Sequence, residues 1–148
     1  METWVSFSGE SMVPGLRPGD RLLVQLIRPA ELRQGDLVVT GPYRLEGRRV
    51  WSAHRCLIHQ GRLATKGDAA ADWDPPAAVV GKVLGLQRGR WRVLWGEGGQ
   101  KLKHWVAWLS RRMQAGPRGR PWRVALRAVN ILEWALQIGN GNVRIDSL

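Results

Sequence analysis

Short apolar segments recur at intervals of roughly ten residues through the first two thirds of the chain, and glycine, proline and aspartate separate them. This pattern is typical of β-strands that alternate with tight turns in an antiparallel sheet or small barrel. The segments lie at residues 21–27, 35–40, 48–55, 62–68, 79–86 and 91–95. We therefore predict a mainly β fold for residues 1–96.

The composition changes after the glycine-rich stretch at residues 96–99. From Gly98 to Leu132 there are eight lysines or arginines and no acidic residue. Apolar residues follow helical spacing in two segments. They are Leu102, Trp105, Val106, Leu109 and Met113 in the first, and Trp122, Leu126, Val129, Leu132 and Leu136 in the second. Residues 97–148 are thus expected to form a basic, tryptophan-rich extension with two amphipathic helices.

The charge balance points to acidic partners. Twenty-three lysines and arginines oppose 12 acidic residues, which gives a net charge of +11. Nucleic acid, an anionic membrane surface or an acidic peptide would each suit this balance. No basic start is followed by an apolar run, and no stretch approaches the roughly 20 apolar residues of a membrane span. We expect a cytoplasmic protein without a signal peptide or transmembrane helix.

Cysteine usage limits the covalent and metal chemistry. Cys56 is the single cysteine, so no intrachain disulfide and no cysteine zinc cluster can form. A lone cysteine usually acts as a small core residue. The sequence implies neither a metal nor an organic cofactor.

Several polar residues fall at turns or strand ends, where catalytic groups are often placed. They are Ser11, Asp20, Asp36, His54, Lys66, Asp68, Asp72 and Asp74. Acyl-bond hydrolysis needs a nucleophile and a base within hydrogen-bond reach. Histidine titrates near pH 6.5, whereas lysine starts near 10.4 and would need desolvation to act as a base. These properties favour His54 over Lys66 as the partner of Ser11.

Five sequence motifs sharpen this interpretation. GESMVPGLRPGD resembles the nucleophile box of type I signal peptidases and of the related LexA-type self-cleaving proteins, and GDLVV resembles the second box. AHRCLI resembles the third box in its endoplasmic-reticulum, archaeal and sporulation-type version, where histidine replaces lysine. ATKGDAAADWDPP and VVGKVLGL resemble the fourth and fifth. All five occur in the expected order across residues 8–86.

The resemblance implies a fold and a set of catalytic residues. It implies an antiparallel peptidase core of the signal peptidase and LexA type, with Ser11 as nucleophile and His54 as general base. The acid that orients His54 falls in the DAAADWD run, where Asp74 has the best spacing and Asp72 is the alternative. Lys66 as the base, on the LexA model, is the other possibility.

The remaining residues of these boxes have supporting roles by the same resemblance. Lys66, Gly67 and Asp68 would form a structural turn. The backbone N–H of Ser11 would bind the oxyanion, and the second donor's position is Gly9, with Ser8 as the nearest hydroxyl.

Two further residues of the nucleophile box complete the expected site. Met12 and Pro14 are expected to be structural, and Met12 also to line the substrate cleft.

The expected function is that of a short serine endopeptidase, without the membrane anchor of typical signal peptidases, that cleaves a precursor, signal or leader peptide. A catalytically idle binding protein with the same fold is the first alternative, and a LexA-type regulator is the second. The helices over residues 101–138 could form a lid on the sheet, contact an anionic membrane surface or bind nucleic acid. No recognised nucleic-acid motif supports the last of these.

Overall fold

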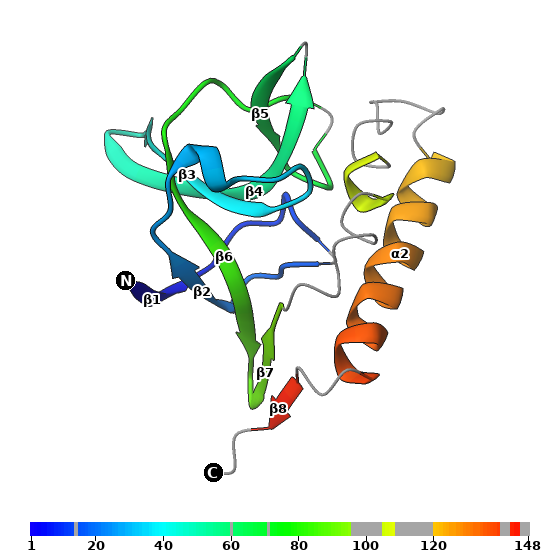
Figure 1. The fold of residues 1–148 in the computed structure, drawn as a ribbon. Helices are drawn as coiled ribbons and strands as arrows, with labels where there is room; N and C mark the ends of the chain where they lie inside the picture. Colours follow the sequence, from blue (N-terminus) through cyan, green and yellow to red (C-terminus); the bar gives the residue numbers. More distant parts are fainter. Residues whose placement is uncertain are drawn as a thin grey trace.

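The protein is built on one antiparallel β-sheet, seen in a computed structural model that describes residues 1–13, 15–59, 61–70, 72–95, 105–108, 120–139 and 143–145 (Figure 1). The strands are β1 (Glu2–Ser6), β2 (Arg21–Gln25), β3 (Leu37–Leu45), β4 (Arg48–His59), β5 (Arg62–Lys66), β6 (Val79–Arg88), β7 (Trp91–Leu94) and β8 (Val143–Ile145). Their order is β1-β2-β6-β3-β4-β5, while β7 pairs with β6 and β8 pairs with β7. The predicted mainly β fold is confirmed.

Each of the six predicted segments contains a strand, but three strands end later than expected: β3 at Leu45, β4 at His59 and β6 at Arg88. A two-residue turn at Glu46 and Gly47, which have φ angles of 49° and 78°, joins β3 to β4. Positive φ at both central residues is the geometry that joins twisted strands in a tight hairpin. The edge strand β1 and the three-residue β8 were not predicted. The residues of β1 are mostly exposed, so they lack the apolar alternation of a half-buried strand.

The two Gly-Asp motifs, at residues 17–20 and 33–36, fold into the same turn. In both, the aspartate N–H donates to the carbonyl of the arginine three residues earlier at 3.1 Å. The arginine N–H donates back to the aspartate Oδ2, at 2.8 Å for Asp20 and 2.9 Å for Asp36. The glycine of each turn has a φ angle of 92°, which only glycine adopts without strain.

The central strand β6 holds both turns in place. Arg88 donates two hydrogen bonds to Asp20, at 2.8 Å and 2.7 Å, and Lys82 Nζ lies 3.0 Å from Asp36 Oδ2. Both carboxylates are buried, so these cations compensate charges that would otherwise be costly to remove from water. The loops that precede β2 and β3 are therefore fixed to one strand.

The hydrophobic core joins the sheet to the loop between β1 and β2. Its buried members are Met12, Leu16, Leu22, Val24, Ala53, Val83 and Leu86, with Phe7, Leu37, Val39 and Trp95 packed against them. Cys56 is also buried, as expected of a core residue. Burial, and then the charge of Asp36, raises the pKa of its thiol to about 12, so it remains protonated at neutral pH.

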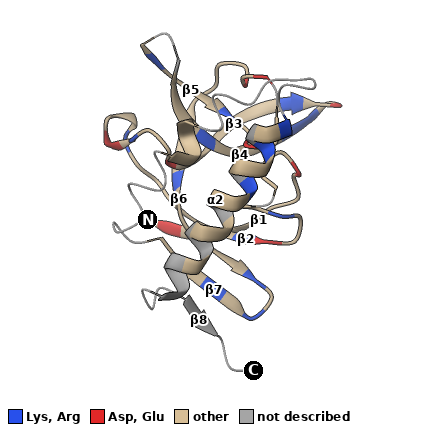
Figure 2. Ribbon diagram, turned by 90° about the vertical axis from the view of Figure 1, so that its right-hand side faces the viewer, with Lys and Arg blue, Asp and Glu red and all other residues tan. Residues whose placement is uncertain are grey.

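The C-terminal extension contains the helix α2 (Arg120–Gly139), which runs along one side of the sheet (Figures 1 and 2). It coincides with the second predicted helix, although Leu132, expected on the apolar face, is 55% exposed. Of the first predicted helix only residues 105–108 are described; they are helical, and the rest lies outside the described residues. Within the described segments, neither helical stretch has the length and apolar character needed to cross a bilayer.

Candidate active site

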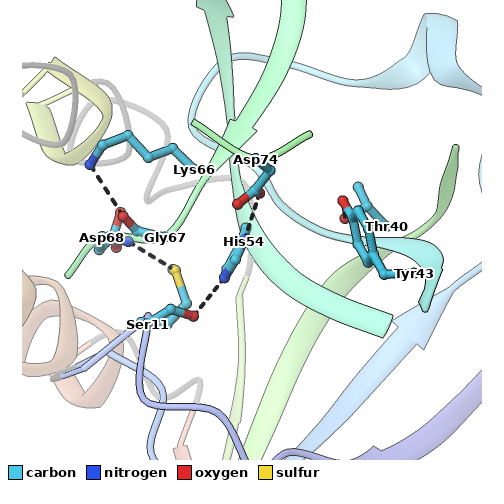
Figure 3. A network of polar contacts seen from close by, with 9 residues as sticks. Ser11, Thr40, Tyr43, His54, Lys66, Gly67, Asp68 and Asp74 are labelled. Atoms are coloured by element: carbon cyan, nitrogen blue, oxygen red, sulfur yellow. Dashed lines mark hydrogen bonds and ion pairs between the residues drawn. The ribbon is translucent and has the colours of Figure 1, made fainter. Parts of the chain in front are cut away.

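Ser11 lies in a compact loop between β1 and β2. Hydrogen bonds from Phe7 N–H to the Asp20 carbonyl and from Gly19 N–H to the Phe7 carbonyl close the base of this loop, at 2.8 Å and 2.9 Å. Next to Ser11, the side chain of Met12 is buried in the core, and the Met12 carbonyl accepts the N–H of Leu16 at 3.0 Å. The core thus anchors the loop, while the half-buried Ser11 side chain points toward β4 (Figure 3).

The structure aligns Ser11, His54 and Asp74 in a continuous chain of hydrogen bonds (Figure 3). Ser11 Oγ lies 2.5 Å from His54 Nε2, and His54 Nδ1 lies 2.6 Å from Asp74 Oδ2. His54 is on β4, and Asp74 lies in the segment between β5 and β6. Residues separated by 43 and 20 positions in the sequence therefore meet in one site.

The charge of Asp74 orients the imidazole of His54 through their hydrogen bond. Burial alone would raise the pKa of Asp74, but hydrogen bonds from His54 and Thr65 and the positive charges nearby hold that pKa below its ordinary value. Asp74 is therefore ionised at neutral pH and accepts the Nδ1 proton of His54. This leaves Nε2 free to accept the proton of the Ser11 hydroxyl.

The two candidate acids are placed differently. Asp74 touches His54, and its own N–H donates to the Thr65 carbonyl at 3.0 Å, which ties it to the end of β5. Asp72 is solvent-exposed. Of the two candidate carboxylates, Asp74 is therefore the one that contacts the His54 imidazole.

A buried ion pair braces the turn that follows β5. Arg55 donates from Nε and Nη2 to the two carboxylate oxygens of Asp68, at 2.8 Å and 2.6 Å, and from Nη1 to the Gly35 carbonyl at 2.9 Å. Arg55 follows His54 on β4, so the ion pair with Asp68 links β4 to the turn after β5. Sequence reasoning did not assign this role to Arg55; its place beside His54 in the AHR motif was the available signal.

Gly67 packs directly against Ser11. A Cβ added there would lie 2.8 Å from both Ser11 Cβ and the Ser11 carbonyl oxygen, and 3.2 Å from His54 Nε2. The next residues bind the same loop: Ala69 N–H donates to the Ser11 carbonyl at 2.7 Å, and Asp68 N–H donates to Met12 Sδ at 3.2 Å. Only glycine allows this close approach between the turn and the serine loop.

Lys66, expected to be part of a structural turn, is the last residue of β5 and is fully buried. Its Nζ donates to the Gly67 carbonyl at 3.2 Å (Figure 3). Burial lowers the pKa of Lys66, and the carboxylates of Asp68, Asp74 and Asp72 oppose that effect. The hydroxyl of Ser11 bonds to His54, not to Lys66.

The remaining residues of the nucleophile box take varied positions. Ser8 is exposed, and Gly9 is half-buried against Phe7, whose Cζ would lie 3.1 Å from an added Cβ. Met12 is 1% exposed and packs in the core, as expected of a structural residue, and its thioether accepts the N–H of Asp68 at 3.2 Å. Pro14 lies outside the described residues.

The three aligned side chains define what the site can do chemically. They can transfer a proton from a serine hydroxyl to an imidazole that a carboxylate orients, which is the first step of nucleophilic acyl transfer. Across the described part of the chain, no three His, Cys, Asp or Glu side chains gather closely enough to hold a metal ion. Comparison with protein-family models, with curated proteins and with solved structures finds no match.

Proposed function

We propose that this protein is a serine endopeptidase of the signal-peptidase type that cleaves a precursor, signal or leader peptide. The observation that carries the proposal is the hydrogen-bonded chain from Ser11 Oγ to His54 Nε2 and from His54 Nδ1 to Asp74 Oδ2. Both ring nitrogens of the imidazole are engaged at once, one with a hydroxyl and one with a carboxylate, as the Ser-His-Asp mechanism requires.

The arrangement of the five motifs supports the same proposal. The nucleophile box forms the Ser11 loop, and the second box forms the last two residues of the turn at residues 33–36 and the start of β3. The third box carries His54 on β4, the fourth carries the turn that packs against Ser11, and the fifth is β6. Segments that resemble signal-peptidase boxes in order along the chain are thus neighbours in space.

The proposed reaction uses one base twice. His54 Nε2 takes the proton of the Ser11 hydroxyl as Oγ attacks the peptide carbonyl, and Asp74 stabilises the imidazolium that results. The backbone N–H of Ser11 donates to the oxyanion. His54 then gives the proton to the leaving amine, which leaves an acyl-enzyme. A water molecule, deprotonated by His54, hydrolyses the ester and restores Ser11.

A mixed peptide library with mass-spectrometric detection of the products tests the proposal. The wild type should cleave a subset of peptides. Ser11→Ala and His54→Ala should lower the rate by at least about a thousandfold, because serine and base act as one unit. Ser6→Ala, which removes a hydroxyl from the exposed end of β1, is the matched control and should leave cleavage unchanged.

The alternative of an idle binding protein predicts a different pattern. Peptides would bind to wild type and Ser11→Ala alike, and no product would appear with either protein. Identical behaviour of these two proteins across several pH values would contradict the peptidase proposal.

A second proposal concerns α2, which we infer to contact an anionic membrane surface. Its exposed side combines Val124, Ile131 and Leu132, at 67%, 65% and 55% exposure, with the exposed arginines Arg120, Arg123 and Arg127 (Figure 2). Residues spaced three or four apart share one side of a helix, so apolar and cationic groups are interleaved there. Such a side can bury apolar groups at the acyl boundary while guanidinium groups meet phosphates.

Flotation with vesicles tests this contact. The wild type should rise with vesicles that contain phosphatidylserine at low salt and should partly dissociate at moderate salt. A triple replacement of Arg120, Arg123 and Arg127 by glutamine should remain at the bottom of the gradient, whereas Arg44→Gln, on the exposed end of β3, should float like the wild type. A wild type that stays in the soluble fraction throughout would overturn the proposal.

A further inference from the structure

Lys66 is a buried cation that the proposed mechanism leaves without a role. It is 1% exposed, and burial of an ammonium group is costly unless neighbouring groups compensate it. Its Nζ donates to the Gly67 carbonyl, and three carboxylates, those of Asp68, Asp72 and Asp74, attract its charge. Because burial of the Lys66 ammonium group costs free energy, we ask what the lysine contributes to the neighbouring Ser11–His54–Asp74 site.

The three carboxylates are not equally available to Lys66. Asp68 already receives two hydrogen bonds from the Arg55 guanidinium, so its charge is compensated. Asp72 is exposed, and water screens its interaction. Asp74 is largely buried and bonds on its other side to the His54 imidazole. The charge of Lys66 is attracted most strongly by Asp68 and next by Asp74, and of these two carboxylates only Asp74 contacts the His54 imidazole.

Lys66 also reaches the serine through one residue. Gly67 accepts the hydrogen bond from Lys66 Nζ and lies so close to Ser11 and His54 Nε2 that no Cβ fits between them (Figure 3). A change in the direction of the Gly67 carbonyl would move the backbone against which Ser11 packs. The lysine thus contacts the support of the nucleophile without touching the nucleophile itself.

We propose that Lys66, in its charged form, is a positioning residue of the Ser11–His54–Asp74 site. It holds Gly67 against Ser11 through the hydrogen bond to the Gly67 carbonyl, and its charge adds to the hydrogen bonds from His54 and Thr65 that keep Asp74 able to orient His54. The catalytic consequence rests on the proposed peptidase function, whereas the effect on Asp74 does not.

The first test measures the titration of the Asp74 carboxyl group by carbon NMR, with the resonance assigned by Asp74→Asn. In Lys66→Met the midpoint should move to higher pH, because a nearby positive charge is lost. Lys66→Arg, which keeps the charge, should stay close to the wild type. Lys82→Met is the matched control: Lys82 pairs with Asp36, so its loss should leave the Asp74 titration unchanged. An unchanged midpoint in Lys66→Met would overturn the proposal.

A reciprocal measurement leaves Lys66 intact and covers the case in which Lys66→Met does not fold. Interacting groups shift one another's titration by the same free energy. In Asp74→Asn the Lys66 ammonium, followed by nitrogen NMR, should lose its proton at a lower pH than in the wild type. The same titration curve in both proteins would contradict the coupling.

The second test is the kinetics of a library peptide that the wild type cleaves. Lys66→Met should lower kcat about tenfold or more with little change in KM, since the lysine acts on the reacting groups and not on peptide binding. Lys66→Arg should restore most of the rate, which a merely volume-filling role would not require. Full activity of Lys66→Met would overturn the catalytic part.

The two tests separate the failure of this inference from the failure of the peptidase proposal. If wild type and Ser11→Ala give no products while the Asp74 titration still responds to Lys66→Met, the peptidase function is wrong and the charge coupling stands. If the wild type cleaves and Lys66→Met matches it in both rate and Asp74 titration, the inference is wrong and the function stands.

Discussion

Asp74 and Asp72 stand two positions apart, yet their surroundings give them different chemistry. Asp74 lies 2.6 Å from the imidazole and has hydrogen bonds that keep its pKa below the ordinary value, against the effect of burial. Asp72 faces solvent. At the residue scale, the role of a carboxylate therefore depends on its partners and not on its place in an acidic run.

This difference gives a direct prediction. Asp74→Asn should keep the fold but lower kcat on a cleaved peptide by about a hundredfold to ten-thousandfold, because an amide cannot hold the imidazole in the required tautomer. Asp72→Asn, the matched control, should change kcat by less than about twofold. The measurement is steady-state hydrolysis at neutral pH. An equal loss in the two variants would contradict the assignment of Asp74.

The lowered pKa of Asp74 also predicts a dependence of stability on pH. Its contribution to the free energy of unfolding is fully present above the unfolded-state pKa, about 3.9 for an aspartate. It is lost as the pH falls through the lower, folded-state pKa of Asp74. Urea unfolding of wild type and Asp74→Asn should therefore differ at pH 7, and the difference should shrink in acid. A difference that grows as the pH falls would be the wrong sign.

At the scale of elements, the turn after β5 is the structural support of Ser11. Its backbone donates to the Ser11 carbonyl and to Met12 Sδ, and Gly67 fills the space beneath Ser11. The serine loop itself is anchored by the core through Met12 and Leu16. Ser11 thus lies in a loop that the core anchors, and it packs against the turn after β5. These two contacts explain how a residue in a glycine- and proline-rich stretch has a fixed position.

Gly67→Ala tests this contact. Because the new methyl group would meet Ser11 Cβ and the Ser11 carbonyl at 2.8 Å, the turn and the loop must separate. We expect hydrolysis to fall about a hundredfold, with a loss of roughly 1–3 kcal/mol in the free energy of unfolding.

A matched glycine variant separates the two effects. Gly47→Ala, in the β3–β4 turn, has a φ angle of 78° and open space around it, so it should lose about 1–2 kcal/mol of stability but no activity. The measurements are urea unfolding and peptide hydrolysis of both variants. If Gly67→Ala loses no more activity than Gly47→Ala, Gly67 does not position the serine.

At the scale of the whole molecule, ion pairs between strands and loops determine how the site is assembled. The central strand β6 supplies Arg88 and Lys82 to the two Gly-Asp turns, and β4 supplies Arg55 to Asp68. Each pair joins segments that are far apart in the sequence. Some of the basic residues behind the net charge of +11 thus form ion pairs within the fold, whereas others are exposed on α2.

The pair between Arg55 and Asp68 is the most buried of these and gives the stability prediction at this scale. Removal of one partner, in Arg55→Met or Asp68→Asn, should lower the free energy of unfolding by about 3–5 kcal/mol, because the other group stays buried and loses its closest opposite charge. The double variant with Arg55→Met and Asp68→Asn should lose less than the sum of the single losses. Urea unfolding measures all three, and strict additivity would contradict the coupling.

The sequence by itself predicted six of the strands and the candidate reacting groups. Alternating apolar residues and Gly-Asp turns are local signals, because a turn type depends on four residues and a strand face on every second one. The second helix followed from its spacing for the same reason. Residue type limits the candidates, since few side chains can attack a carbonyl or take a proton near neutral pH, and the resemblance of the five motifs to signal-peptidase boxes selected Ser11 and His54 among them.

Only the tertiary structure decided which groups meet. It placed Asp74, and not Asp72, against His54, and it paired Arg55 with Asp68. It also buried Lys66 beside the site and Met12 in the core. It also added β1 and β8, whose pairing depends on neighbours supplied by other parts of the chain. These outcomes depend on distances between residues remote in sequence, and burial then determines which charges need a partner. No local pattern contains that information.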